Sequence, residues 1–171
     1  MMSRAVVLLG FAFALLAAST LHAQTPGPDW VRVTEHAPWQ ARDSQGEVAF
    51  GGKLWIFGGW YDSFKLAPRD VWSSPDGKDW TLVTAEAPWK HSDLPMSLVF
   101  ADRMWMLGGW ANGRLPDHEA GNDVWSSADG KNWEEATPHA GWSARLAAAA
   151  VVFKSDFVHE HSHQWNPPAA V

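Results

Sequence analysis

The sequence predicts an all-β protein built from a four-stranded unit that recurs about every 50 residues. The phrase DVWSSPDGKDW at 70–80 returns with two changes as DVWSSADGKNW at 123–133. KLWIFGGW at 53–60 likewise returns as RMWMLGGW at 103–110. The second copy is three residues longer, and the extra length lies in a polar stretch that contains Gly and Pro. A fixed period with a variable loop indicates a repeated structural unit.

Each unit divides into four short apolar segments separated by turn residues. The second segment is apolar on both alternating faces, which suits a strand that is buried on both sides. Asp-Gly at 76–77 and at 129–130 predicts a turn between the third and fourth strands, because such turns need backbone angles that glycine tolerates. The predicted strands are 47–50, 53–59, 70–74 and 79–84 in one unit, and 97–100, 103–109, 123–127 and 132–137 in the next.

Two further segments look like pieces of the same unit. DWVRVT at 29–34 matches the fourth strand, so an outer strand is predicted there. GWSARLAAAAVVF at 141–153 matches the start of a unit, with a first strand at AAVVF. We therefore expect complete units at about 41–83 and 91–136 and a third unit that begins at 141–153.

The repeat resembles the kelch repeat of β-propellers over residues 30–153. The resemblance implies a kelch-like β-propeller fragment, with two complete four-stranded blades, an N-terminal outer strand and the start of a third blade. A sialidase-type Asp-box is the alternative for SPDGKDW, but it has one more residue between Asp and Trp and does not explain the glycine pairs. The positions that match the kelch pattern are Gly58, Gly59, Gly108, Gly109, Trp72, Trp125, Trp80 and Trp133.

The pattern stops after residue 153. Aligning Phe153 with Phe100 places His161 and Ser162 where the glycine pair should be, so 154–171 is expected to be an atypical tail that contains His and Pro. Because propellers usually close with 4–8 blades, truncation or frameshift of a longer gene is expected. Closure by oligomerisation and an unusual small fold are the alternatives. Open blades expose apolar faces and strand edges, so self-association is also expected.

The N-terminus and the composition place the chain outside the cytoplasm. A basic start, an apolar run of 14 residues and a polar stretch have the layout of a signal peptide at 1–23, cleaved near Ala23. The run is shorter than the roughly 20 residues of a membrane span, so no span is expected after cleavage. The mature chain from residue 24 onward would be secreted or periplasmic, with the partial kelch-like propeller at 24–153. The absence of cysteine excludes thiol chemistry, and a net charge of −6 argues against a nucleic-acid partner.

The candidate ligand site lies in the loops that follow the second strand and in the loops between units, which emerge on the same face. Trp60 and Trp110 follow the glycine pairs and could form a platform for a sugar ring. Arg42 and Arg145 could bind a carboxylate or form ion pairs between blades. We expect a protein or glycan ligand there. The candidate residues are Arg42, Trp60, Tyr61, Asp62, His91, Asp93, Trp110, Asn112, Arg114, His118 and Arg145.

Of the two enzyme classes that the resemblance suggests, the sequence excludes one. The resemblance extends to galactose-oxidase-type enzymes, whose copper site needs a Tyr cross-linked to Cys; without Cys and with Tyr61 alone, the chain cannot build it. An enzyme of the sialic-acid mutarotase type would draw acid–base groups from His91, Asp93, His118 and Glu119. We expect no cofactor and no metal site. The histidines of HEHSH at 159–163 suit adventitious metal binding. A fragment without a function of its own is the remaining alternative.

Overall fold

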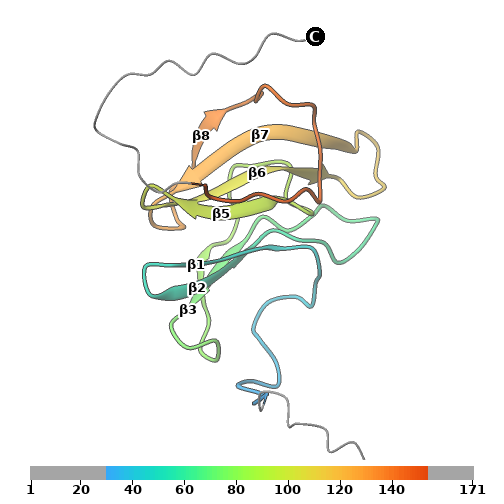
Figure 1. The fold of residues 1–171 in the computed structure, drawn as a ribbon. Coiled ribbons are helices and arrows are strands. Elements are labelled where there is room, and N and C mark those ends of the chain that lie inside the picture. The colour runs from blue at the N-terminus through green and yellow to red at the C-terminus, as the bar shows by residue number, and fades with distance from the viewer. Residues whose placement is uncertain (1–29, 154–171) are drawn as a thin grey trace, which may run out of the picture. The chain divides into compact units, whose positions relative to one another are not determined.

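The computed structural model describes residues 30–153, and every regular element in that range is a β-strand. Eight strands form two four-stranded antiparallel sheets, with the orders β1-β2-β3-β4 and β5-β6-β7-β8 (Figure 1). The first contains β1 (Gly46–Phe50), β2 (Lys53–Phe57), β3 (Val71–Ser74) and β4 (Thr81–Thr84). The second contains β5 (Met96–Phe100), β6 (Arg103–Ala111), β7 (Glu119–Ser127) and β8 (Glu134–Thr137). The predicted all-β class and the two complete four-stranded units are confirmed.

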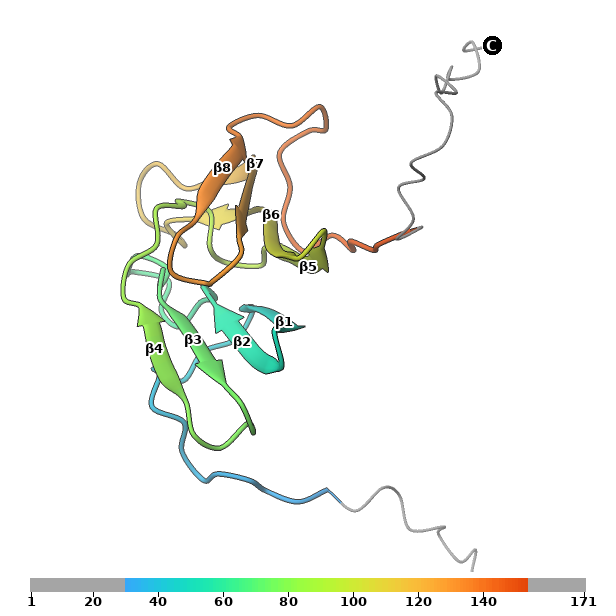
Figure 2. The same cartoon turned by 90° about the vertical axis from the view of Figure 1, so that its left-hand side faces the viewer.

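The two sheets belong to the same compact part of the chain, which starts at Val33. Figure 2 shows them one above the other, with β1 and β5 on one side and β4 and β8 on the other. In each sheet the strands follow one another in sequence order, so neighbouring strands are joined by local turns. This arrangement is consistent with two neighbouring blades of a β-propeller.

Short turns close one edge of each sheet. Gly51 and Gly52 join β1 to β2 with positive φ angles, and Ala101 and Asp102 take the same left-handed conformation between β5 and β6. The turns between the third and fourth strands are longer. The side chain of Asp76 accepts hydrogen bonds from the backbone N–H groups of the two residues that follow Gly77, and Gly77 itself has a φ of 77°. The predicted Asp-Gly turns are confirmed, and the carboxylate stabilises them.

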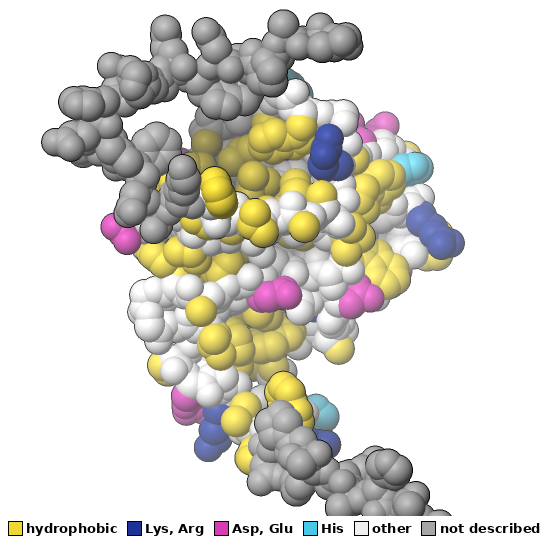
Figure 3. Space-filling model, in the orientation of Figure 1, with side chains coloured by type: hydrophobic (Ala, Val, Ile, Leu, Met, Phe, Trp, Pro, Cys, Tyr) yellow, Lys and Arg dark blue, Asp and Glu magenta, His cyan; other side chains and the backbone are white. Residues whose placement is uncertain are grey.

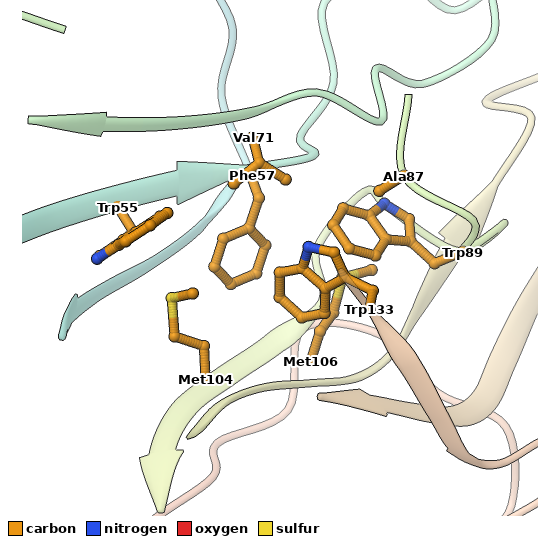
Figure 4. Close-up of a cluster of buried hydrophobic side chains, with 8 residues drawn as sticks. All are labelled: Trp55, Phe57, Val71, Ala87, Trp89, Met104, Met106 and Trp133. Carbon is orange, nitrogen blue, oxygen red and sulfur yellow. The ribbon is translucent and has the colours of Figure 1, made fainter. Parts of the chain in front are cut away.

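The core lies between the two sheets (Figure 4). Trp89 and Trp133 meet edge to face, with ring centroids 4.4 Å apart. Phe57 completes an aromatic trio, 5.4 Å from Trp133 and 6.1 Å from Trp89. Such edge-to-face pairs contribute about 0.5–1.5 kcal/mol beyond the burial of their area. The cluster consists of Trp55, Phe57, Val71, Ala87, Trp89, Met104, Met106 and Trp133.

The glycine pairs allow the chain that leads to the next unit to pass close to the end of the second strand. Gly59 has a φ of 101°, and its N–H donates to the carbonyl of Ser92 at 2.7 Å. A Cβ atom on Gly59 would lie 2.6 Å from the Asp43 carbonyl oxygen. Gly109 has the same role and donates to the carbonyl of Arg145 at 3.0 Å. The predicted structural role of the pairs therefore has a steric cause.

Three connecting segments, 39–44, 89–94 and 142–147, precede the units and are linked to one another. The N–H of Leu94 donates to the carbonyl of Ser44 at 2.9 Å, and the N–H of Ala147 donates to the carbonyl of Leu94 at 3.0 Å. All three residues have positive φ, between 52° and 58°. This conformation is uncommon for residues other than glycine, and it recurs at the repeat spacing of 50 and 53 residues. The third connecting segment is therefore packed like the first two.

Two predicted strands do not form. Residues 30–34 and 149–153 have no strand structure. A strand needs a hydrogen-bonded neighbour, and no strand of the described residues pairs with either segment. The outer strand and the first strand of the third unit were thus wrong predictions, although the connecting segment before the latter is in place. The predicted signal peptide at 1–23 and the histidines of the tail lie outside the described residues.

Candidate functional site

The longer loops gather at one edge of the two sheets. In an antiparallel meander, the end of the second strand and the start of the third lie at the same edge as the ends of the unit. The loops between β2 and β3 and between β6 and β7 therefore lie beside the connecting segments, as the sequence predicted. We call this the loop edge. The opposite edge carries the turns at 51–52 and 101–102 and the Asp-Gly turns.

The loops of the two sheets touch at this edge. The N–H of Arg114 donates to the carbonyl of Ser63 at 2.9 Å. Trp110, near the end of β6, is anchored to the same loop, because its Nε1 donates to the carbonyl of Gly113 at 2.8 Å. A cavity of about 220 Å³ lies here, and it is lined by Leu66, Ala67, Arg69, Lys90 and Asn112.

Trp60 and Trp110 occupy equivalent positions and are each tied to an aspartate. Paired backbone hydrogen bonds join Asp43 to Trp60 at 2.8 and 3.0 Å, and Asp93 to Trp110 at 2.7 and 3.1 Å. Both indoles are half-buried. In each unit the backbone therefore holds a tryptophan and an aspartate in register.

Asp93 is the most perturbed carboxylate of the loop edge. It is 8% exposed, and its Oδ1 has no hydrogen-bond partner. Burial raises the pKa of Asp93, and the nearby charge of Asp43 raises it further, to about 6, against the lowering effect of the Leu94 N–H. A carboxyl group with such a pKa can both donate and accept hydrogen bonds near neutral pH.

Arg42 is engaged inside the protein. Its guanidinium pairs with both carboxylate oxygens of Asp70 and donates to the carbonyl of Gly58 at 3.0 Å, and its side chain is 2% exposed. The indole Nε1 of Trp72 donates to Asp70 at 2.8 Å. The sequence left open a bound carboxylate or an ion pair between blades for Arg42, and the structure shows instead an ion pair with Asp70 of the same unit.

His91 takes the equivalent role in the second sheet. Its Nδ1 lies 2.8 Å from Asp123 Oδ1, and Trp125 Nε1 donates to Asp123 Oδ2 at 2.7 Å. Burial raises the pKa of Asp123, but hydrogen bonds from His91 and Trp125 outweigh it and lower the pKa overall. The arrangement of Arg42, Asp70 and Trp72 in one sheet is therefore matched by His91, Asp123 and Trp125 in the other, with a histidine in place of the arginine.

The other candidate residues lie in the same loops, and several of them make local contacts there. Asn112 donates to the carbonyl of Asp117 at 3.1 Å, and the ring of His118 lies 5.3 Å from that of Trp110. Asp62 accepts a hydrogen bond from the Phe64 N–H at 2.8 Å. Tyr61 is half-buried, with the ammonium of Lys65 5.7 Å from its ring. Arg145 is exposed and donates to Ser143.

The four proposed acid–base residues are brought together only in part. Glu119 accepts a hydrogen bond from Lys90 at 2.5 Å, which lowers the pKa of Glu119 and raises that of Lys90. His91 Nε2 lies 3.8 Å from Glu119 Oε1. The ring of His118 packs on Trp110, and its Nδ1 lies 2.9 Å from the carbonyl of Leu115. Asp93 lies by the Asp43 carboxylate instead.

Sequence reasoning missed three contributors to this edge. Asp70 pairs with Arg42, Asp123 lies at hydrogen-bond distance from His91, and Asp43 is the second carboxyl group beside Asp93. The repeat itself carried the signal, because Asp43 and Asp93 are 50 residues apart and Asp70 and Asp123 are 53 residues apart. The recurrence of these aspartates at the repeat spacing is as strong a signal as the recurrence of the tryptophans.

Fold and site together define the class: an all-β protein with two blade-like four-stranded sheets and a loop-bearing edge rich in aromatic and acidic groups. No family model and no curated protein matches the chain. It is similar to a solved structure described as "Structure of YjhT", with 18% sequence identity and a TM-score of 0.49. That match covers 64% of this chain and 40% of the other, so the chain spans less than half of that structure.

Residues 30–153 contain neither a metal-binding cluster nor a membrane-spanning helix. No group of three or more His, Cys, Asp or Glu side chains in this range could hold a metal ion. The range also contains no helix with the length and apolar character of a membrane span.

Proposed function

We propose that this protein is an exported kelch-type binding module that holds a glycan at its loop edge. The observation that supports this most directly is the pairing of Trp60 with Asp43 and of Trp110 with Asp93 through backbone hydrogen bonds. An indole face packs on the apolar face of a sugar ring, and carboxylates accept hydrogen bonds from its hydroxyl groups. A protein ligand at the same edge is the alternative within this class.

The test measures glycan binding by the chain and by two variants. The chain should bind a subset of glycans on an array, and titration calorimetry should show that Trp60→Ala and Trp110→Ala each weaken the binding by at least about tenfold. Trp30→Ala is the matched control, because this tryptophan is 94% exposed and lies away from the loop edge in sequence. Absence of glycan binding, or equal affinity of all variants, would contradict the proposal, and capture of a protein through Trp60 and Trp110 would favour the alternative.

A second candidate function is acid–base catalysis on a carbohydrate, and the carboxyl pair of Asp43 and Asp93 favours it. Asp43 is exposed, whereas Asp93 is buried and its pKa is raised to about 6, so Asp93 retains its proton more readily than an ordinary aspartate does. A carboxyl group with a raised pKa beside a second carboxyl group is typical of acid–base sites. Turnover of a bound sugar that Asp93→Asn abolishes, without loss of binding, would establish this function over simple binding.

A further inference from the structure

We infer that the open faces of the two sheets bind each other head to tail between copies of this chain. Each sheet has one face in the shared core and one face turned away from it. In Figure 3, hydrophobic side chains gather on the surface over the β5–β6 region and again over β1 and β2. The residues of these two faces occupy repeat positions that are paired with each other in the core.

The open face of the second sheet matches a face that is already covered. In the first sheet, Trp55, Phe57 and Val71 pack in the core against the second sheet. One repeat later the same positions are Trp105, Leu107 and Val124. These three line a groove of about 440 Å³ on the open face of the second sheet. In the core, the equivalent face of the first sheet is covered by the second sheet. We therefore expect the open face of the second sheet to be covered by a further sheet.

The open face of the first sheet is equivalent to the face of the second sheet that lies in the core. Met104, Met106 and Trp133 cover the first sheet in the core. One repeat earlier the same positions are Leu54, Ile56 and Trp80, and all three line a groove of about 390 Å³ on the open face of the first sheet. The chain therefore exposes both halves of the interface that it forms internally.

The open face of the first sheet already carries an indole pair with the geometry of the pair in the core. Trp39 and Trp80 pack edge to face with centroids 4.4 Å apart and planes at 85°. Trp89 and Trp133, which receive Phe57 in the core, have the same separation and the same angle. A second copy would thus bring a preorganised indole pair to Leu107, the equivalent of Phe57. Preorganisation lowers the cost of association.

The third connecting segment, 142–147, already covers part of the groove on the open face of the second sheet. WSAR at 142–145 repeats WQAR at 39–42, and Trp142 lines the groove beside Leu107. A second copy that docks in the register of the core would bring its own residues 39–44 to the position of 142–147. Its Arg42 carbonyl and Ser44 N–H would replace those of Arg145 and Ala147, so the backbone hydrogen bonds to Gly109 and Leu94 would be kept. The net gain is the burial of the faces of β2, β3, β6 and β7.

An interface between two different faces can repeat without limit unless the rotation closes it into a ring. Each copy adds two blades, and propellers close with 4–8 blades. The expected assembly is therefore a closed ring of about two to four copies.

The test compares the mass of the full chain with that of single-face variants, by light scattering over a concentration series. Leu54→Asp damages the first open face, and Leu98→Asp damages the second, where Leu98 lines the groove. The chain should form a discrete oligomer, and each variant should associate at least about 100-fold more weakly, because docking would bury an unpaired charge. Leu66→Asp is the matched control, since Leu66 is 65% exposed in a loop, and it should assemble like the unaltered chain.

Mixing the two variants distinguishes this interface from a symmetric one. Each variant keeps one intact face, and the two intact faces are complementary, so an equal mixture should form heterodimers and nothing larger. Circular dichroism verifies that each variant is folded. A monomeric chain at every concentration, association unchanged in both variants, or failure of the mixture to form dimers would each overturn the inference.

Discussion

At the scale of single residues, Asp43 and Asp93 show how a repeat can place one side chain in two environments. The two residues are 50 positions apart and make the same backbone hydrogen bonds to a tryptophan. Asp43 is exposed, whereas Asp93 is buried and has a raised pKa. The connecting segment of the second unit lies between the two sheets, so its carboxylate loses the water that hydrates its counterpart.

Replacing Asp93 tests this difference. Because its pKa of about 6 lies above the ordinary 3.8, the folded state binds a proton between these pH values that the unfolded state does not bind. The free energy of unfolding therefore falls as pH rises from about 4 to 6, and it stays lower above pH 6. Asp93→Asn should be more stable than the unaltered chain by about 1 to 3 kcal/mol at pH 7 and no more stable at pH 4.

Urea unfolding at the two pH values measures the effect. Asp102→Asn is the control, because Asp102 is exposed in a turn at the opposite edge. An Asp93→Asn variant that keeps the pH dependence of the unaltered chain between pH 4 and 6 would show that another group causes it.

At the scale of elements, the glycine pair determines how closely the connecting segments approach the end of the second strand. Gly59→Ala should lower the free energy of unfolding by about 2 to 4 kcal/mol, because the new Cβ would lie 2.6 Å from a backbone oxygen of Asp43 at a φ of 101°. Thermal and chemical unfolding measure the change. Gly141→Ala is the control, since nothing lies within 4 Å of a Cβ at that position. Equal stability of both variants would mean that the connecting segment can move away.

The strands and turns of both sheets could be predicted from the sequence because their signals are local. Alternating apolar residues, Asp-Gly turns and glycine pairs each act within a few residues, and they agree in two copies. The segments at 30–34 and 149–153 have the same local signals, but a strand also depends on a neighbour.

The candidate site was predicted in outline because loop position follows from strand order. The partners of its side chains could not be predicted in the same way. The Arg42–Asp70 pair and its His91–Asp123 counterpart join residues 28 and 32 positions apart, across connections whose paths the sequence does not specify.

At the scale of the whole molecule, the two sheets share one core and are expected to unfold together. Phe57 is fully buried against residues of both sheets. Phe57→Ala should lower the free energy of unfolding by about 3 to 5 kcal/mol, the usual cost of such a cavity. Tryptophan fluorescence and far-ultraviolet circular dichroism should still give one coincident transition.

Phe64→Ala is the matched control for this variant. Phe64 is 73% exposed in the loop between β2 and β3, so its removal should change stability by no more than about 0.5 kcal/mol. Two separate transitions in the Phe57→Ala variant would show that each sheet folds without the other.

The indole pairs give the molecule an internal optical reporter. Two perpendicular rings 4.4 Å apart couple their electronic transitions, and each pair thereby adds its own signed bands to the ultraviolet spectrum. Trp89 and Trp133 hold Phe57 of the neighbouring sheet, whereas Trp39 and Trp80 lie on the free side of the first sheet. One chromophore pair therefore senses contact within the chain, and the other is placed to sense whatever settles against its outer surface.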